Sequence, residues 1–139
     1  MKIKETNSLS IQIEFETPEE KERILTFVNS LETKIMGYQD GKKYLLNIES
    51  IYYIEIVDKQ TFIYTKDACY ESYLWLYQLE EQLNNNFVRV NKSTICNMTY
   101  IESLKADFGS RIMVYLDNGD QILVSRTFAK SFKERLEGV

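Results

Sequence analysis

Three short polar segments interrupt the apolar runs of this chain, and their side chains are suited to binding nucleic acid. They contain Lys59, Gln60, Asn91, Lys92, Ser93, Ser125 and Arg126. Lysine and arginine bind phosphate oxygens and guanine acceptor atoms, asparagine and glutamine pair with adenine, and hydroxyl groups bind phosphate. Each segment alone also fits an ordinary solvent-facing turn. The three segments predict a binding surface if the fold gathers them at one edge.

The second segment lies in the stretch FVRVNKSTICN, residues 87–97. A strand-like run, FVRV, leads into four polar residues, NKST, and the chain then returns to apolar residues. This change of pattern predicts a strand end or loop tip, with the NKST side chains, including Thr94, facing solvent.

The residue types needed for most enzymes and metal sites are scarce in this sequence. It has no histidine, which removes the commonest general base and the commonest metal ligand. Cys69 and Cys96 fit no metal-binding spacing, and we expect both to be reduced thiols. A glycine-rich phosphate loop and a GxSxG motif are both missing. We therefore expect no catalytic residue, no metal and no cofactor, and we expect that the protein is not an enzyme.

Charge is distributed unevenly along the chain, whose net charge is −4. Residues 1–86 carry nine Lys and Arg against fifteen Asp and Glu, a net charge of −6. Residues 87–139, which contain the NKST stretch, carry eight against six, a net charge of +2. An asymmetry of this size also arises by chance. It nevertheless makes a nucleic-acid partner compatible with an acidic protein.

Length and composition indicate a folded domain. The chain has 139 residues, of which 44% are hydrophobic, with one Pro and five Gly. Ten tyrosines, together with many Ile, Val, Phe and Thr, favour β-sheet. No apolar run is long enough to cross a bilayer, and the N-terminal stretch lacks the pattern of a secretory signal. We therefore expect a cytoplasmic protein.

The first part of the chain predicts a strand and a helix followed by a series of strands. Thr17 and Pro18 are typical of a helix start, and apolar residues at helical spacing follow them. Asp40 and Gly41 form a favoured hairpin turn. The predicted elements are a strand at 10–16, a helix at 18–32, strands at 35–39, 42–48, 51–57, 61–65 and 67–72, and a short helix at 73–83.

The last part of the chain predicts further hairpins and a final helix. Asn118 and Gly119 indicate a hairpin turn, and Ser125 is a candidate helix cap. Residues 94–101 fit either a helical turn or an irregular segment. The other predicted elements are strands at 87–90, 102–107, 111–116 and 121–125 and a helix at 126–137. The whole pattern predicts an α+β fold that is mainly β, with antiparallel strands and about three short helices.

Three longer patterns occur in a defined order: IYYIEIVDKQTFIYT, FVRVNKSTICNMTYIESL and DNGDQILVSRTFAKSFKERL. They resemble the first strand pair, the most distinctive segment and the closing hairpin, strand and helix of the LytTR DNA-binding domain of bacterial transcription regulators. The resemblance spans residues 44–138. It implies elongated antiparallel β-sheets, with residues 41–139 as the DNA-binding domain and residues 1–40 as a strand–helix extension.

The resemblance also implies a function and a set of contact residues. Members of the family regulate transcription by inserting loops into successive grooves of double-stranded DNA, often at repeated promoter sites. The DNA-facing residues implied for this chain are Lys92, Arg126 of the Ser125–Arg126 pair, and the Lys59–Gln60 turn, with Asn91 and Ser93 suited to phosphate. Asn97 matches a recurrent asparagine that we expect to be structural. Lys92 replaces an arginine of many members and lacks its planar fork, so sequence preference there is expected to be softer.

Several alternatives stay open at this point. The chain resembles the stand-alone branch of the family, because only about forty residues precede the resemblance. This extension either completes the core or forms a dimer through the helix at 18–32, and we expect a homodimer. Control by a membrane protein is a further expectation, which a neighbouring gene for such a protein would support. The rival functions are a protein-interaction module that no longer binds DNA and a redox sensor at Cys96, for which a buried small residue is the favoured alternative.

Overall fold

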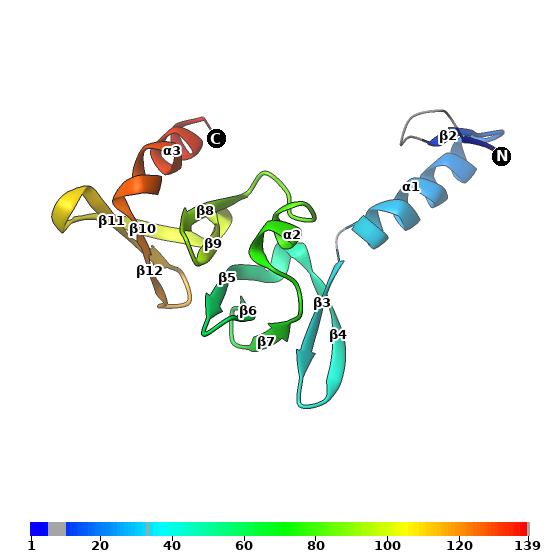
Figure 1. Cartoon of the computed structure of the whole chain (residues 1–139). Coiled ribbons are helices and arrows are strands. Elements are labelled where there is room, and N and C mark those ends of the chain that lie inside the picture. Colours follow the sequence, from blue (N-terminus) through cyan, green and yellow to red (C-terminus); the bar gives the residue numbers. More distant parts are fainter. Residues whose placement is uncertain (6–10, 33, 139) are drawn as a thin grey trace. The chain divides into compact units, whose positions relative to one another are not determined.

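The computed structural model describes residues 1–5, 11–32 and 34–138, and Figure 1 traces their path. The chain divides into two units, Met1–Lys34 and Ile35–Val139, and each is described by itself. Among the described residues, no helix is both long enough and apolar enough to cross a membrane. The hairpin whose turn is Asp40 and Gly41 lies within the second unit.

The first unit consists of a hairpin and a helix. Strands β1 (Lys2–Glu5) and β2 (Ile11–Glu14) pair antiparallel, and α1 (Pro18–Glu32) follows them. The predicted strand at 10–16 is confirmed over Ile11–Glu14, and Ser10 lies outside the described residues. Thr17 caps α1 as predicted, because its Oγ1 accepts a hydrogen bond from the Glu20 amide at 3.1 Å.

The first unit leaves apolar side chains exposed. None of its described side chains is buried, and on α1 the exposed fractions of Leu25 and Phe27 are 45% and 62%. A unit of this size buries too little surface to be stable on its own.

The second unit contains a seven-stranded sheet with the strand order β4-β3-β7-β6-β5-β9-β8. Its strands are β3 (Lys34–Gln39), β4 (Lys42–Asn47), β5 (Ile51–Val57), β6 (Gln60–Thr65), β7 (Cys69–Ser72), β8 (Phe87–Asn91) and β9 (Thr94–Asn97). The pairings of β3 with β7 and from β7 through to β8 are antiparallel. Strand β9 thus enters between β5 and β8, which brings residues far apart in sequence side by side.

A second sheet and a helix complete this unit. Strands β10 (Ile101–Asp107), β11 (Arg111–Leu116) and β12 (Gln121–Val124) form an antiparallel sheet in that order, and α3 (Arg126–Glu137) follows. The predicted hairpin turn at Asn118 and Gly119 is confirmed, because the amide of Gly119 donates to the carbonyl of Leu116 at 3.0 Å. The fold is mainly β with antiparallel strands, as expected.

Strands β8 and β9 are shared by two hydrophobic cores. Phe87 and Ile95 pack into a core with the β3–β6 strands and α2 (Leu76–Glu80). Val88, Val90 and Cys96 face the other way, into a core formed with the second sheet and α3. This pair is therefore buried on both faces, which holds the turn that joins the two strands in a fixed position.

Two sequence-based expectations need correction. The helix predicted at 73–83 is confined to Leu76–Glu80, because the Leu74 amide donates to the Ser72 Oγ at 3.2 Å and Trp75 has extended backbone angles. Thr94, expected at a solvent-facing tip, is 4% exposed and begins β9. The undecided segment 94–101 forms β9, a 3-10 turn (Met98–Tyr100) and the first residue of β10.

Candidate nucleic-acid interface

Two hydrogen bonds join the end of β8 to the end of β12 and to Ser125, the residue before α3. The Ser125 amide donates to the Val90 carbonyl at 3.0 Å, and the Asn91 Nδ2 donates to the Leu123 carbonyl at 2.9 Å. The chain segments that carry Lys92 and Arg126 are consequently held next to each other, although 33 intervening residues separate them in the sequence.

A third hydrogen bond joins the turn between β8 and β9 to the end of β5. The Ile56 amide donates to the Ser93 carbonyl at 2.8 Å. Strand β5 runs on through Val57 into the Asp58–Lys59 turn, where both residues have left-handed backbone angles, with φ of 50° and 66°. We call the resulting row of turns the three-turn edge. It comprises Lys59, Gln60, Asn91, Lys92, Ser93, Ser125 and Arg126.

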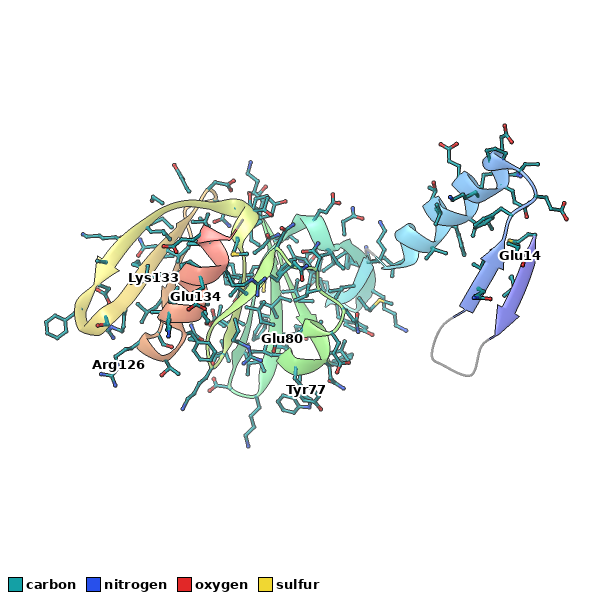
Figure 2. All side chains as sticks on the ribbon, turned by 90° about the horizontal axis from the view of Figure 1, so that it is seen from above. Glu14, Tyr77, Glu80, Arg126, Lys133 and Glu134 are labelled. Carbon is teal, nitrogen blue, oxygen red and sulfur yellow. The ribbon has the colours of Figure 1, made fainter. Side chains whose placement is uncertain are left out.

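The cationic side chains of the three-turn edge face solvent. Lys59, Lys92 and Arg126 are exposed, as are Gln60 and Ser93. Within the described part of the chain, none of the three cations forms an ion pair. Figure 2 shows Arg126 at the start of α3 with its side chain directed away from the ribbon. All three charges are therefore free to bind an anionic ligand.

Asn91 has a positioning role in this arrangement. Its side chain is half-buried, its Oδ1 accepts from the Ser93 amide at 2.8 Å, and its Nδ2 is engaged by Leu123. One side chain thus shapes the Lys92–Ser93 turn and ties it to β12. With both polar groups of its amide engaged, Asn91 is better suited to fixing the turn than to contacting phosphate directly.

Ser125 stands at the N-terminal cap of α3 but does not cap the helix with its side chain, which corrects the sequence-based expectation. Its backbone carbonyl accepts from the Phe128 amide at 3.0 Å instead. The start of α3 also carries the positive end of the helix dipole, which favours a bound anion. Ser125 and Arg126 therefore combine a hydroxyl group that does not cap the helix and a guanidinium group at the positive end of the helix dipole.

Arg89 stabilises the turn that carries Lys92. It was not among the functional residues predicted from the sequence. Its Nη1 donates to the Lys92 carbonyl at 3.0 Å, and its Nη2 forms an ion pair with Glu80 of α2. Its Nε is buried and has no hydrogen-bond partner. The arginine of the FVRV run could have been identified as near the tip, but nothing local points to Glu80 as its partner.

Asn97 is structural, as expected. It is 2% exposed, its Nδ2 donates to the Ile51 carbonyl at 2.9 Å, and its Oδ1 accepts from the Thr99 amide at 3.0 Å. The residue therefore connects β9 to β5 and initiates the turn that follows β9.

The two cysteines differ in exposure. Cys69 is exposed and Cys96 is fully buried. Burial raises the pKa of the Cys96 thiol to about 12, so it is protonated at neutral pH. Partial burial also raises the pKa of the Cys69 thiol. A protonated thiol without solvent access is a poor oxidation target, which favours Cys96 as a packing residue.

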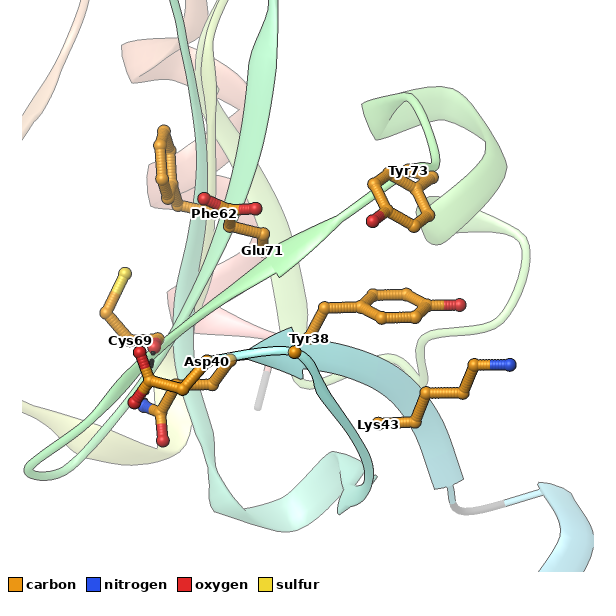
Figure 3. A pocket seen from close by; sticks show the side chains of 9 residues that line it. Tyr38, Asp40, Lys43, Phe62, Cys69, Glu71 and Tyr73 are labelled. Carbon is orange, nitrogen blue, oxygen red and sulfur yellow. Dashed lines mark hydrogen bonds between the residues drawn. The ribbon is translucent and has the colours of Figure 1, made fainter.

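A separate pocket of about 590 Å³ opens beside the β3–β4 hairpin (Figure 3). The ring centroids of Tyr38 and Tyr73 lie 4.4 Å apart on one side of the pocket. Cys69 and Asp40 lie at its other end. No residue of the three-turn edge lines this pocket. In the described ranges, no cluster of three or more His, Cys, Asp and Glu side chains could hold a metal ion.

Comparison with known proteins gives consistent results. A model of the LytTr DNA-binding domain family matches residues 41–137. An uncharacterized HTH-type transcriptional regulator of Staphylococcus aureus (strain MRSA252) is 34% identical over 115 residues, which cover 81% of this chain and 78% of the relative. A second such regulator, from strain NCTC 8325 / PS 47, is 33% identical with the same coverage.

One solved structure extends the comparison to the fold. A LytTr DNA-binding domain of a putative methyl-accepting/DNA response regulator from Bacillus cereus superposes with a TM-score of 0.72 at 23% identity. The match covers 75% of this chain and 96% of that domain. In the described part of this chain, strands separate the helices from one another, so two consecutive helices do not form a helix-turn-helix.

Proposed function

Because the chain belongs to the LytTR family of DNA-binding regulatory domains, we propose that it is a sequence-specific transcription regulator that reads double-stranded DNA with its three-turn edge. The observation that carries the proposal is the set of backbone hydrogen bonds that brings Lys59, Lys92 and Arg126 to one edge. Acting on chromosomal DNA requires a cytoplasmic location, which is part of the proposal.

Different members of the edge have different roles in this mechanism. Ser93, Ser125 and the start of α3 bind phosphate, and together with the cations they supply most of the affinity. Arg126 has the planar fork that can bind the two acceptors of guanine, whereas Lys92 offers a point charge. We therefore assign base discrimination mainly to Arg126 and a mixed phosphate and base contact to Lys92.

The proposal is tested by DNA titration. A duplex recovered from a randomised pool with the wild-type protein is titrated with Lys92→Ala and Arg126→Ala at several salt concentrations. Each variant is expected to lose about 1–3 kcal/mol of binding free energy, because each removes a charge-assisted contact. The slope of log affinity against log salt is expected to fall by about 0.9 for each phosphate group that the variant no longer binds.

Lys43→Ala is the matched control for this titration. Lys43 is an exposed lysine on β4, the edge strand farthest from β8 in the sheet order. Its removal is expected to leave the affinity nearly unchanged. Wild-type affinity of both Lys92→Ala and Arg126→Ala would disprove the site assignment.

We further propose that the protein is a homodimer that uses the exposed apolar side chains of α1. The first unit has no buried side chain of its own among the described residues, and its helix carries four Glu against Lys21 and Arg23, a net charge of −2. This acidic character disfavours DNA or an anionic lipid surface as the partner of the helix. Two linked protomers would bind repeated sites much more tightly than one.

Light scattering of the full chain tests the dimer. Leu25→Asp and Phe27→Asp probe two different sides of α1, because residues two apart do not share a helix face. The variant on the dimer side is expected to give a monomer, because it places a charge in an apolar contact. Thr26→Asp adds the same charge at the exposed residue between them and is expected to stay dimeric. The same molar mass for all three variants and the wild type would refute this role for α1.

A second candidate function rests on the charge distribution. Residues 1–86 carry a net charge of −6, which would suit a basic protein partner if the DNA-binding activity were absent. Control of this chain by a membrane protein is a further proposal of the same kind, because it also requires a contact with another protein. The titration above separates the two functions, since an interaction module would select no DNA sequence from the pool.

A further inference from the structure

Phe108 is the most exposed large hydrophobic side chain in the described part of the chain. It lies in the β10–β11 turn (Phe108–Ser110) with an exposed fraction of 87%. Its neighbours Gly109 and Ser110 have left-handed backbone angles, with φ of 74° and 65°, so the chain turns sharply there. Single exposed apolar residues are common on protein surfaces. Phe108 is of interest because of its position relative to Arg126.

The Phe108 turn lies at the same end of the second sheet as Arg126. In the pairing of β11 with β12, Ile112 near the start of β11 is opposite Val124 at the end of β12. Arg126 follows two residues after Val124, and α3 contacts the Phe108–Ser110 turn. Figure 2 shows the start of α3, with Arg126, at the end of the sheet where β10 and β11 are joined. Phe108 therefore extends the three-turn edge beyond Arg126.

The backbone beneath Phe108 is fixed by a single side chain. Arg111 Nε donates to the Phe108 carbonyl at 2.8 Å, and Arg111 Nη2 forms an ion pair with Asp107 at 3.2 Å. These bonds close the turn on itself. Because the backbone of the turn is already ordered, binding costs mainly the rotamer entropy of the Phe108 side chain and not the ordering of a loop.

We infer that Phe108 is a fourth DNA-contacting element, which places its ring against the apolar surface of a base at the end of the site. The inference rests on the proposed function. DNA offers such surface as a thymine methyl group or as the face of a partly unstacked base. A protein interface is a poorer fit, because Asp107, Gly109 and Ser110 make the rest of the turn polar and a single ring falls short of an interface core.

The first test is a titration of Phe108→Ala against the duplex recovered with the wild-type protein. The variant is expected to bind about 10-fold more weakly, in the range for removal of one apolar contact with a base. Its salt slope is expected to equal that of the wild type, because no charge is removed, whereas Lys92→Ala lowers both affinity and slope. Phe108 is a surface side chain, so circular dichroism is expected to show an unchanged fold.

Two further measurements identify the surface that Phe108 contacts. Replacing each thymine of the duplex by uracil removes one methyl group, and a methyl contact predicts that one replacement weakens the wild type but not Phe108→Ala. A contact with a base face predicts fluorescence quenching of Phe108→Trp on DNA addition, measured in a Trp75→Phe background because Trp75 is the chain's own tryptophan.

The outcomes separate this inference from the proposed function. Wild-type affinity of Phe108→Ala, together with weakened binding of Lys92→Ala, would overturn the inference and leave the proposed function intact. A change of molar mass in Phe108→Ala without a change in DNA affinity would overturn it in favour of a protein contact. Failure of the wild-type protein to select any sequence would overturn both.

Discussion

The amide of Ser125 lies 3.0 Å from the carbonyl oxygen of Val90 and donates a hydrogen bond to it. This bond joins the end of the second sheet to β8, and it sets the spacing between Arg126 and Lys92. Both partners are backbone atoms, so the spacing depends on the fold and not on side-chain flexibility. The DNA-binding proposal depends on this relationship more than on any single side chain.

Asn91→Ala is predicted to lower DNA affinity although the residue is assigned no contact with DNA. The substitution removes the bonds to Ser93 and Leu123, so the Lys92 turn loses its fixed position and must be ordered on binding. We expect the free energy of unfolding to fall by about 1 kcal/mol or more and the affinity to fall several-fold. Chemical denaturation and DNA titration measure the two effects.

Asn118→Ala is the control for this prediction. Asn118 forms the same kind of turn, since its Oδ1 accepts from the Asp120 amide at 3.0 Å, but it lies outside the three-turn edge. It is expected to lose similar stability while retaining wild-type affinity. Equal losses of affinity in both variants would show that Asn91 acts through general stability alone.

Asn97→Ala is predicted to destabilise the second unit strongly. The Ile51 carbonyl would lose its buried donor and the Thr99 amide its acceptor. Leaving buried polar groups unsatisfied is expected to lower the free energy of unfolding by about 2–4 kcal/mol. Asn85→Ala, at an exposed position, is expected to change it by less than about 0.5 kcal/mol. Urea denaturation that gives equal stability for the two variants would contradict the structural role of Asn97.

The thiols are predicted to react separately with a disulfide reagent. Cys69 is exposed and is expected to react in the folded protein, and Cys96 only after unfolding, because it is buried and its pKa is about 12. A spectroscopic count of released thiolate is therefore expected to give one equivalent in buffer and two in denaturant. In Cys69→Ser the folded count should fall to zero. Rapid reaction of folded Cys69→Ser with the reagent would contradict the burial of Cys96 and support the redox hypothesis.

Stability is predicted to fall at alkaline pH, in part because of Tyr52. Burial and the hydrogen bond to Asp117 Oδ1 at 2.5 Å raise the pKa of Tyr52 to about 12. The unfolded side chain titrates near pH 10, so the folded state binds more protons between about pH 10 and 12 and loses stability as pH rises through that window. Denaturation at several pH values is expected to show a smaller decline for Tyr52→Phe. An equal decline for Tyr52→Phe and the wild type would contradict this contribution of Tyr52.

Local chemistry predicted much of the fold. Asp40 with Gly41 and Asn118 with Gly119 located two hairpins, because few residues tolerate left-handed turn angles. Thr17 correctly predicted the start of α1, because its hydroxyl group accepts a hydrogen bond from an amide of the first helical turn. These features depend on neighbours within a few residues, which is why sequence alone was sufficient.

Long-range pairing could not be predicted in the same way. Strand β9 lies between β5 and β8 and is buried on both faces. Thr94, which was expected at a solvent-facing tip, is buried for this reason. The partnership of Arg89 with Glu80 likewise depends on how α2 packs. The candidate contact residues were proposed from local sequence patterns, but their gathering at one edge depends on hydrogen bonds between distant segments.

The most direct measurement of the central claim is a DNA titration with two triple variants that remove the same positive charge. One is Lys59→Ala/Lys92→Ala/Arg126→Ala, and the other is Lys42→Ala/Lys43→Ala/Lys66→Ala, whose residues are exposed and lie outside the three-turn edge. We predict that the first loses about 100-fold or more in affinity for the selected duplex, and that the second loses less than about 3-fold. Equal losses in the two variants would contradict the claim, because they would show that total charge, and not the three-turn edge, determines DNA binding.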